Sequence, residues 1–477
     1  MPQRNVLLIC VDHWPGRYIG GLGHPTVLTP TLDTMMQNGV TFTNAYSTTP
    51  TCIPARRELY TGTFSRTHGD RVFSEKMPMP ALPTLQQSFR NAGYQAQAVG
   101  KLHVYPQRDR IGFDDVLLLE EGRHHLGGGK DDFELFLQEQ GYAGQELTHG
   151  MGNNEYMVRP WHLPERCHPT NWTTREACKM IYRRDPTRPA FWYVSYQHPH
   201  PPLAPVAEYL DMYRHMEIDM PFMGEWAADP EAMPYALRSR RNQGGQYSEA
   251  AIRLARQAFY AQCTYVDHQM RLLIGTLREQ GLLENTILGF ICDHGDMLGN
   301  HGLYAKTVFY EDSARIPMLL VPAASDPRGG QGVRDERLAT LADVMPTLLE
   351  MCDLPVPESV EGLSLIGPAR REYIYGEHNE DARATRMIHD GRYKLIYYPV
   401  GNRSQLFDLR EDPRELRDLS AEPALADTFR RLTDRLVACL YGGDLEWVRD
   451  GKLLGLPDRD YSPAPNKAYS GQRGWRF

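Results

Sequence analysis

Residues 5–13 read NVLLICVDH, and this stretch decides the fold. After Asn5 the run is continuously apolar up to Val11, which is typical of a parallel strand buried on both faces. It ends in Asp12 and His13, so ionisable side chains stand directly after the strand. The chain therefore opens with a predicted interior strand whose end carries polar groups.

Further along the chain, short apolar runs alternate with helical patterns. A pattern with apolar residues three to four apart predicts a long helix over residues 249–280, which Gly281 ends. Strands separated by helices predict an α/β fold with a large, mostly parallel sheet sandwiched by helices. The other predicted helices span residues 31–38 and 84–91, and the other predicted strands span residues 94–99, 190–197, 286–292 and 317–321.

The character of the sequence changes near Pro368. Short alternating strands at residues 386–389 and 393–398, followed by a helix over residues 424–440, predict a smaller α+β domain. The predicted division is a catalytic α/β domain of residues 1–367, a C-terminal subdomain of residues 368–454 and a C-terminal arm of residues 455–477. The arm has no periodicity, so it is either disordered or laid over a neighbouring subunit, and we expect a homo-oligomer, a dimer or a tetramer.

Composition excludes several classes of protein. The 477 residues carry a net charge of -8 with a pI near 6.1, so a nucleic acid is not an expected partner. No apolar run approaches the roughly 18 residues that span a bilayer, and no membrane partner is expected. The first apolar run leads into Asp12 instead of a cleavage site, which predicts a cytoplasmic protein. Eight scattered cysteines argue against a disulfide framework or a zinc finger.

Polar residues directly after predicted strands mark the expected site. In parallel sheets, ligands gather beyond the carboxyl ends of the strands. The groups in this position are Asp12-His13, Lys101-Leu102-His103, His198-Pro199-His200 and Asp293-His294.

The most specific motif is CIPAR at residues 52–56, followed by LYTG at residues 59–62. It resembles the signature of the type I sulfatase family, formylglycine-dependent arylsulfatases of the alkaline phosphatase superfamily, close to the phosphonate monoester hydrolase branch. Other segments follow in family order: GKLH at residues 100–103, SYQHPHPP at residues 195–202, and DHGD at residues 293–296 with Lys306. The similarity covers roughly residues 5 to 350.

The resemblance implies a nucleophile built from Cys52. In the family a dedicated formylglycine-generating enzyme oxidises this cysteine, and a metal-bound hydroxyl of the hydrated aldehyde attacks the sulfur atom of a small sulfate ester. Arg56, four residues along the helix, would lie near that hydroxyl and help to keep it ionised. His103 would be the base that helps to expel sulfate and restore the aldehyde.

The remaining predicted catalytic residues are cations. By the resemblance, Lys101, His200 and Lys306 would bind the sulfate oxygens, and either His200 or Lys306 would protonate the leaving alcohol. His198 fits the family pattern less well than His200. The sequence does not choose between the two acids.

The predicted metal ligands are Asp12, His13, Cys52, Asp293 and His294. The family commonly has an aspartate at position 13 and often an asparagine at position 294, so His13 and His294 are departures from its pattern. One divalent metal ion is expected, with calcium preferred because of the family and manganese as the alternative that imidazole ligands favour.

Three other functions compete with sulfate ester hydrolysis. The first is hydrolysis of phosphonate monoesters or phosphodiesters, although that branch lacks the Lys-x-His pair that Lys101 and His103 form here. The second keeps Cys52 as a thiolate beside a histidine, and it leaves Asp12 and Asp293 unexplained. The third is a catalytically silent metal-binding or scaffold protein. The sequence does not identify the alcohol, whether aryl, choline-like or sugar.

Overall fold

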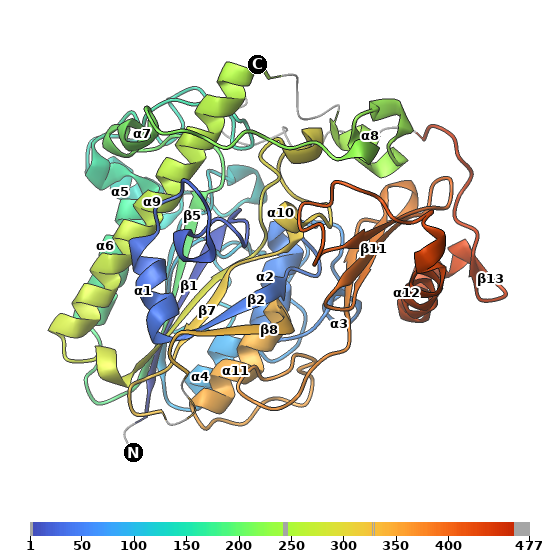
Figure 1. The fold of residues 1–477 in the computed structure, drawn as a ribbon. Coiled ribbons are helices and arrows are strands. Elements are labelled where there is room, and N and C mark those ends of the chain that lie inside the picture. Colours follow the sequence, from blue (N-terminus) through green and yellow to red (C-terminus); the bar gives the residue numbers. More distant parts are fainter. Residues whose placement is uncertain (1–2, 242–246, 327, 329, 462–477) are drawn as a thin grey trace.

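An eight-stranded sheet forms the centre of the computed structural model, which describes residues 3–241, 247–326, 328 and 330–461 (Figure 1). The strand order is β4-β3-β5-β1-β6-β7-β2-β8. Neighbouring strands run parallel except at β7, which is antiparallel to both β6 and β2. The mostly parallel sheet is confirmed. The strands are β1 (Asn5–Asp12), β2 (Val40–Tyr46), β3 (Gln95–Gly100), β4 (Asp115–Leu118), β5 (Ala190–Pro199), β6 (Thr286–Cys292), β7 (Met318–Val321) and β8 (Val333–Thr340).

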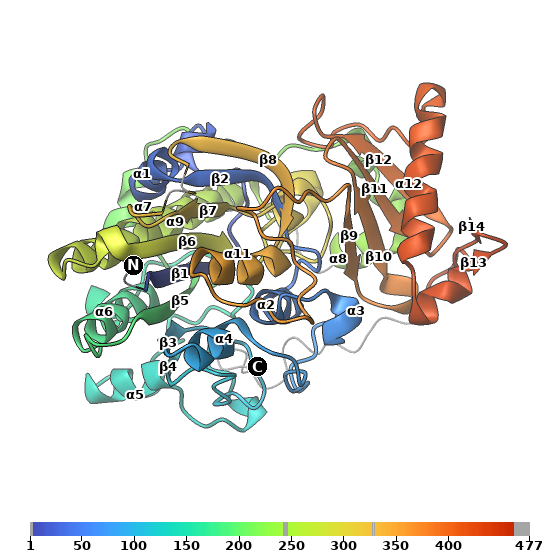
Figure 2. The same ribbon diagram turned by 90° about the horizontal axis from the view of Figure 1, so that it is seen from below.

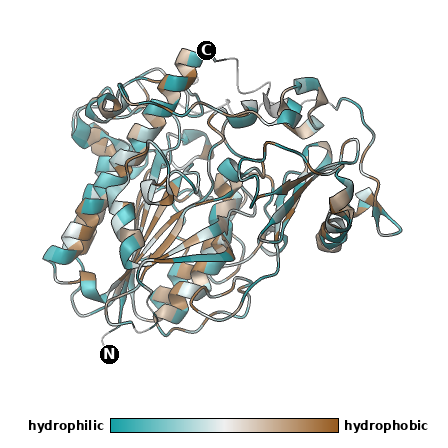
Figure 3. Cartoon of the chain, viewed as in Figure 1, coloured by the Kyte–Doolittle hydropathy of each residue, from teal (hydrophilic) through white to brown (hydrophobic). Residues whose placement is uncertain are grey.

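The opening strand lies in the interior of the sheet, as its apolar run predicts. It pairs with β5 on one side and β6 on the other, and all eight of its residues are buried. Figure 3 shows the strands at the centre as largely hydrophobic, whereas hydrophilic and hydrophobic residues alternate along the helices around them. Burial of continuous apolar strands on both faces is the main source of stability here.

Helices cover both faces of the sheet (Figures 1 and 2). The predicted long helix is α9, which begins after the N-cap Ser248 and ends just before Gly281, a glycine with φ of 67°. One layer consists of α1 (Pro30–Asn38), α6 (Pro169–Tyr182) and α9 (Glu249–Glu279). The other consists of α2 (Cys52–Thr61), α4 (Leu85–Asn91) and α11 (Val344–Met351).

The smaller C-terminal part is a four-stranded antiparallel sheet with a helix against it (Figure 2). This confirms the α+β character predicted for the end of the chain, while the boundary at residue 367 stays a prediction. Its elements are β9 (Ile374–His378), β10 (Thr385–His389), β11 (Tyr393–Tyr398), β12 (Arg403–Asp408) and α12 (Ala426–Cys439). Smaller elements elsewhere are α3 (Ser65–His68), α5 (Asp132–Glu139), α7 (Ala207–Tyr213), α8 (Tyr235–Arg241), α10 (Glu311–Ala314), β13 (Val448–Arg449) and β14 (Lys452–Leu453).

The beginning of the predicted C-terminal arm packs on its own chain. Leu456 pairs with Val400, and the Tyr235 hydroxyl donates to the Tyr461 carbonyl at 2.9 Å. The rest of the predicted arm, residues 462–477, lies outside the described residues. Among the helices that the structure describes, none has the length and apolar character to cross a membrane.

Candidate active site

The site lies where parallel strands end together at one edge of the sheet. Asp12 is the last residue of β1, and Asp293 follows β6 directly. These strands are neighbours in register, with Val11 opposite Cys292, and the Asp293 amide donates to the Val11 carbonyl at 3.3 Å. The sheet therefore brings the two predicted carboxylates side by side, and both are fully buried.

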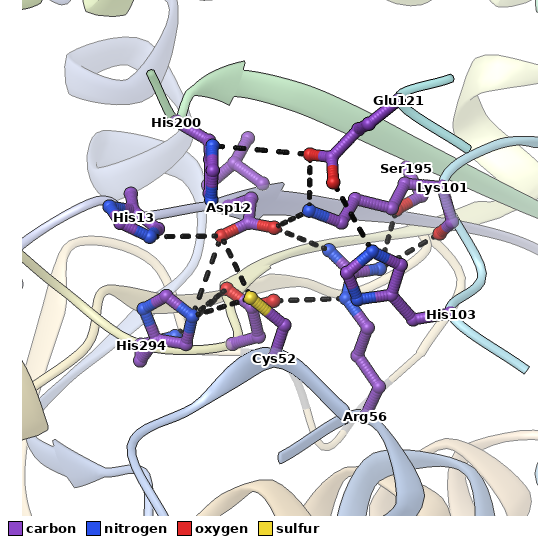
Figure 4. A network of polar contacts seen from close by, with 12 residues as sticks. Asp12, His13, Cys52, Arg56, Lys101, His103, Glu121, Ser195, His200 and His294 are labelled. Carbon is purple, nitrogen blue, oxygen red and sulfur yellow. Dashed lines mark hydrogen bonds and ion pairs between the residues drawn. The ribbon is translucent and has the colours of Figure 1, made fainter. Parts of the chain in front are cut away.

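Cys52 is brought to the same edge by α2. It is the first residue of that helix, all ten residues of which are buried. Its Sγ lies 3.1 Å from His294 Nε2 and 3.8 Å from Asp12 Oδ1 (Figure 4). Strand β1, helix α2 and the turn after β6 thus contribute to one cluster.

Four side chains could hold a metal ion. One donor atom from each of Asp12, Cys52, Asp293 and His294 lies within 4.8 Å of the others. His294 Nδ1 is 3.0 Å from the Gly295 carbonyl, so its Nε2 faces Asp12 Oδ1 at 3.5 Å and Asp293 Oδ1 at 3.8 Å. Two buried carboxylates and an imidazole nitrogen around one point form a donor set that fits a divalent cation.

His13 lies beside this cluster in a second group with Asp12, Cys52 and His200. Its Nδ1 lies 2.8 Å from Asp296 Oδ2, and its Nε2 lies 3.8 Å from Asp12 Oδ1. A ligand histidine commonly donates its other ring N–H to a carboxylate in this way. The role of His13 as a ligand stays a prediction. Asp296 stands in the recognised DHGD segment, but its bond to His13 depends on tertiary structure.

Arg56 ties the two carboxylates to the neighbouring strands. Its Nε donates to Asp293 Oδ2 at 2.9 Å, and its Nη2 lies 3.7 Å from Asp12 Oδ2. Its Nη1 donates to the Lys101 carbonyl and to Ser195 Oγ, both at 2.8 Å. Burial opposes the charged form, but Asp293 raises the pKa of Arg56 well above its usual value. The guanidinium is therefore a permanent positive charge inside the cluster.

Lys101 is a buried ammonium between two carboxylates. Its Nζ lies 2.5 Å from Asp12 Oδ2 and 2.5 Å from Glu121 Oε1. Burial works against the charge, yet Asp12 and Glu121 together raise the pKa of Lys101 above its usual value. Burial alone would raise the pKa of Asp12 too, but Lys101 and nearby imidazoles hold it well below its usual range.

Glu121 is a member of this cluster that was not predicted from the sequence. It follows β4, a strand that was not predicted, and it has a positive φ of 58°. Besides Lys101, its side chain contacts His103, with Glu121 Oε2 and His103 Nε2 3.4 Å apart. The preceding Glu120 accepts the backbone N–H groups of Leu102 and His103, each at 2.9 Å. Two acidic residues after an apolar run were the available signal.

The other predicted cations converge on the same place. Lys306 Nζ lies 3.2 Å from His200 Nε2 and also contacts His13 Nε2. His200 Nδ1 faces the Pro201 carbonyl at 2.5 Å. His198 points elsewhere, with its Nδ1 3.0 Å from Thr170 Oγ1. The structure therefore brings every predicted site residue into one cluster, in which all of these side chains are buried except the half-buried Lys306.

The chain is similar to several known proteins. The family model described as Sulfatase matches residues 4–354, and one described as N-sulphoglucosamine sulphohydrolase, C-terminal, matches residues 299–440. An arylsulfatase of Clostridium perfringens is 33% identical over 95% of this chain and 98% of its own length. The multifunctional alkaline phosphatase superfamily protein PehA of Trinickia caryophylli is 26% identical over 90% of this chain and 94% of its own. The solved phosphonate monoester hydrolase of Agrobacterium radiobacter superposes with a TM-score of 0.77 at 22% identity, covering 91% of this chain and 95% of that one.

Proposed function

Because this chain belongs to the sulfatase family, we propose that it hydrolyses sulfate monoesters as an arylsulfatase does, with a formylglycine made from Cys52 and one divalent metal ion. Family membership makes the protein a sulfuric ester hydrolase. The observation that carries the proposed mechanism is the position of Cys52, whose Sγ lies 3.1 Å from His294 Nε2 at the start of α2.

The donors around Cys52 support the proposed metal. Asp12, Asp293 and His294 would hold the ion, with His13 as a further ligand. When bound, the metal supplies positive charge that lowers the pKa of a hydroxyl, and the hydrated formylglycine supplies that hydroxyl as the nucleophile. We propose calcium because of the family, and manganese is the alternative that two imidazole ligands would favour.

The side chains of the chain itself bind and orient the ester in this proposal. Lys101 and Lys306 bind the non-bridging oxygens through charged hydrogen bonds, which are strongest where water is excluded. His200, which was predicted to bind them as well, lies beside Lys306. His200 Nδ1 donates to the Pro201 carbonyl, so its Nε2 carries a lone pair that faces Lys306 Nζ at 3.2 Å. This tautomer leaves Lys306 as the donor of the proton to the leaving oxygen.

His103 is proposed as the base. Burial, aided by Arg123 and Lys101, lowers the pKa of His103 well below its usual value, so the imidazole is neutral. Its Nε2 faces Glu121, while its buried Nδ1 makes no hydrogen bond within the described structure. A neutral imidazole has a lone pair that can accept a proton at Nδ1, and Glu121 beside Nε2 would stabilise the imidazolium that forms.

Three further proposals concern the maturation, the cellular compartment and the oligomeric state of the enzyme. A formylglycine-generating enzyme would act on Cys52 during maturation, since residues 52–56 carry the motif that the family's enzyme reads. The cytoplasm is the proposed compartment, supported by eight cysteines that are all free thiols in the structure. A dimer or tetramer is the proposed assembly.

Hydrolysis of phosphonate monoesters or phosphodiesters is the second proposed activity. The similarity to a protein named as multifunctional favours it, and so does a site whose cations suit any tetrahedral anion. By the resemblance, the phosphonate branch lacks the Lys-x-His pair that Lys101 and His103 form, and this pair favours sulfate as the main substrate.

The experiment that tests the proposal is expression beside a formylglycine-generating enzyme, followed by peptide mass analysis around Cys52 and turnover of an aryl sulfate and a phenyl phosphonate ester. We expect an aldehyde at position 52, dominant sulfate turnover, and no turnover by a folded Cys52→Ala variant. Cys178→Ala, at a half-buried position on α6, is the matched control and stays active. Full activity with an unmodified thiol would refute the mechanism and support thiolate chemistry, and dominant phosphonate turnover would move the enzyme to the other branch.

A further inference from the structure

Glu121 places a buried carboxylate among the side chains that are proposed to bind sulfate (Figure 4). Its Oε1 lies 2.5 Å from Lys101 Nζ and 3.9 Å from His200 Nδ1. Its Oε2 lies 3.4 Å from His103 Nε2. A negative charge is thus built into a cluster whose proposed function is to bind an anion.

The carboxylate is fixed in this position. Glu121 adopts a φ of 58°, which is uncommon for a residue with a side chain, and Gly122 after it has a φ of 65°. Arg123 Nη2 lies 3.3 Å from Oε2, and Asn153 Nδ2 donates to the same oxygen at 3.4 Å. Glu121 therefore keeps its position and its negative charge when an ester binds, and the ester does not displace it.

Two carboxylates already compensate the positive charge of Lys101 in the absence of substrate. Asp12 Oδ2 and Glu121 Oε1 each lie 2.5 Å from its Nζ. Asp12 is also a predicted metal ligand, so its charge would be shared with the ion. Glu121 is not a predicted metal ligand. Its charge is paired with Lys101 and Arg123, and its repulsion falls on whatever anion Lys101 binds.

We propose that Glu121 is a specificity-determining residue that restricts the site to singly charged esters and favours release of the doubly charged product. The proposal rests on the function proposed above, because it concerns the side chains that are proposed to bind the same anion. Sulfate monoesters, phosphodiesters and phosphonate monoesters carry one negative charge. Phosphate monoesters are mostly doubly charged at neutral pH, since their second pKa is about 6. A like charge held in place against the wrong ligand is a common source of specificity.

The same repulsion grows during the reaction. Hydrolysis breaks the bond between sulfur and the ester oxygen, joins an oxygen from water to sulfur, protonates the alcohol and releases one proton to solvent. The singly charged ester thereby becomes a sulfate ion with two negative charges. Glu121 disfavours this product more than the substrate, and the product leaves more readily.

The test compares Glu121→Gln with the unaltered, matured enzyme. We expect the ratio of kcat/KM for 4-nitrophenyl phosphate to that for 4-nitrophenyl sulfate to rise about tenfold or more, and the inhibition constant of inorganic sulfate to fall about tenfold. Glu75→Gln is the matched control, because Glu75 contacts Arg123 Nη1 at 2.6 Å on the outer side of the same network. It leaves both quantities unchanged, and Glu121→Asp retains the discrimination.

Calorimetric binding of inorganic sulfate gives a readout that needs no activity. The variant with both Cys52→Ala and Glu121→Gln is expected to bind sulfate about tenfold more tightly than Cys52→Ala alone. Equal or weaker binding, together with an equal loss of turnover on all esters, would mean that Glu121 only positions Lys101, and would overturn the proposal.

The unaltered enzyme supplies a test even if Glu121→Gln does not fold. It should hydrolyse 4-nitrophenyl phenylphosphonate, which is singly charged, more efficiently than the doubly charged 4-nitrophenyl phosphate at pH 8. Equal efficiency contradicts the proposal. Failure of the proposed function looks different: no ester is turned over and Cys52 stays a thiol, while the difference in sulfate binding persists.

Discussion

His13 Nδ1 lies 2.8 Å from Asp296 Oδ2, and this contact fixes which ring nitrogen faces the proposed metal. With Nδ1 donating to the carboxylate, Nε2 carries the lone pair; it contacts Lys306 Nζ and lies 3.8 Å from Asp12 Oδ1. The Tyr156 hydroxyl donates to the same Asp296 oxygen at 2.5 Å and accepts the Ala305 amide at 2.9 Å. The carboxylate is therefore held from a second side while it orients the imidazole.

Replacing Asp296 by alanine should weaken metal binding. Loss of the partner that orients a ligand histidine typically lowers metal affinity or activity about 10- to 100-fold. Turnover and thermal stability of the chelator-treated Asp296→Ala protein, measured while calcium or manganese is added back, would show the shift. Tyr156→Phe is the control, since it removes one contact to Asp296 and leaves His13 bonded. A metal titration that matches the unaltered protein would mean that His13 is not a ligand.

Arg56→Lys should damage both the fold and the chemistry. The guanidinium serves Asp293, the Lys101 carbonyl and Ser195 at once, which a single ammonium cannot do. Each buried acceptor left unpaired costs about 1–3 kcal/mol, and a small displacement of Lys101 could lower kcat about 100-fold. Urea unfolding and steady-state kinetics would measure the two effects.

The neighbouring arginine provides the control for this experiment. Arg57 lies on the same helix, but its Nη1 donates to the Pro78 carbonyl at 2.8 Å and its Nη2 to the Met77 carbonyl, away from the cluster. Arg57→Lys should lower stability and leave kcat unchanged. If Arg56→Lys also left kcat unchanged, the guanidinium would serve the fold alone.

The elements predicted from sequence are those with a strong local signal. Strands β1 and β6 are continuous apolar runs, and α9 keeps helical spacing over 31 residues, so each specifies its own conformation. Strand β4 gives only a weak signal, because it has four residues, its apolar run is correspondingly short, and only Leu118 among its residues is buried. The antiparallel direction of β7 could not be predicted from the sequence either, because the direction of a strand depends on its pairing with strands that are distant in the chain.

The site was predicted to the extent that its residues stand in motifs or directly after predicted strands. Glu121 stands after β4, which was missed, and therefore its contact with Lys101 was missed as well. Asp296 lies in a recognised segment, but its bond to His13 joins residues 283 positions apart. Such pairings are decided by how the sheet aligns its strands, and no single segment encodes them.

The stability of the protein should depend on the ionisation of Glu58. Burial raises the pKa of Glu58 to about 7, although Thr48 and the Ala342 amide donate hydrogen bonds to it. The folded protein therefore binds more protons than the unfolded chain between about pH 4.5 and 7. This contribution is fully present below the unfolded pKa and is lost as pH rises through 7, with a size of about 3 kcal/mol.

Glu58→Gln removes the group that titrates. The difference in unfolding free energy between pH 5 and pH 8, measured with urea, should be about 3 kcal/mol smaller in this variant than in the unaltered protein. Glu336→Gln, at an exposed position on β8, is the control and should change that difference little. An identical difference in the Glu58→Gln protein would show that Glu58 is ionised at both pH values.

Lys394→Met should loosen the contact between the C-terminal sheet and the catalytic part. Lys394 on β11 is fully buried, and its Nζ lies 2.8 Å from Glu311 Oε1 and 2.7 Å from Glu415 Oε1. Glu311 belongs to α10, in the chain segment that follows Lys306, so the ammonium joins β11 to the segment beside the site. Removing one partner from a buried ion cluster costs about 3–5 kcal/mol, which thermal or urea unfolding would detect.

The loss caused by Lys394→Met should depend on pH. Without the ammonium, burial and mutual repulsion raise the pKa of both carboxyls, so their protonated forms are favoured in the folded state. Stability is then retained below their unfolded pKa values and lost as pH rises, and the variant should be less destabilised at pH 5 than at pH 8. Adding Glu311→Gln and Glu415→Gln should restore much of the stability, because no uncompensated charge remains. A single variant that is as stable as the unaltered protein at pH 8 would show that the carboxyls are already neutral, and that the cluster holds the two parts together by packing alone.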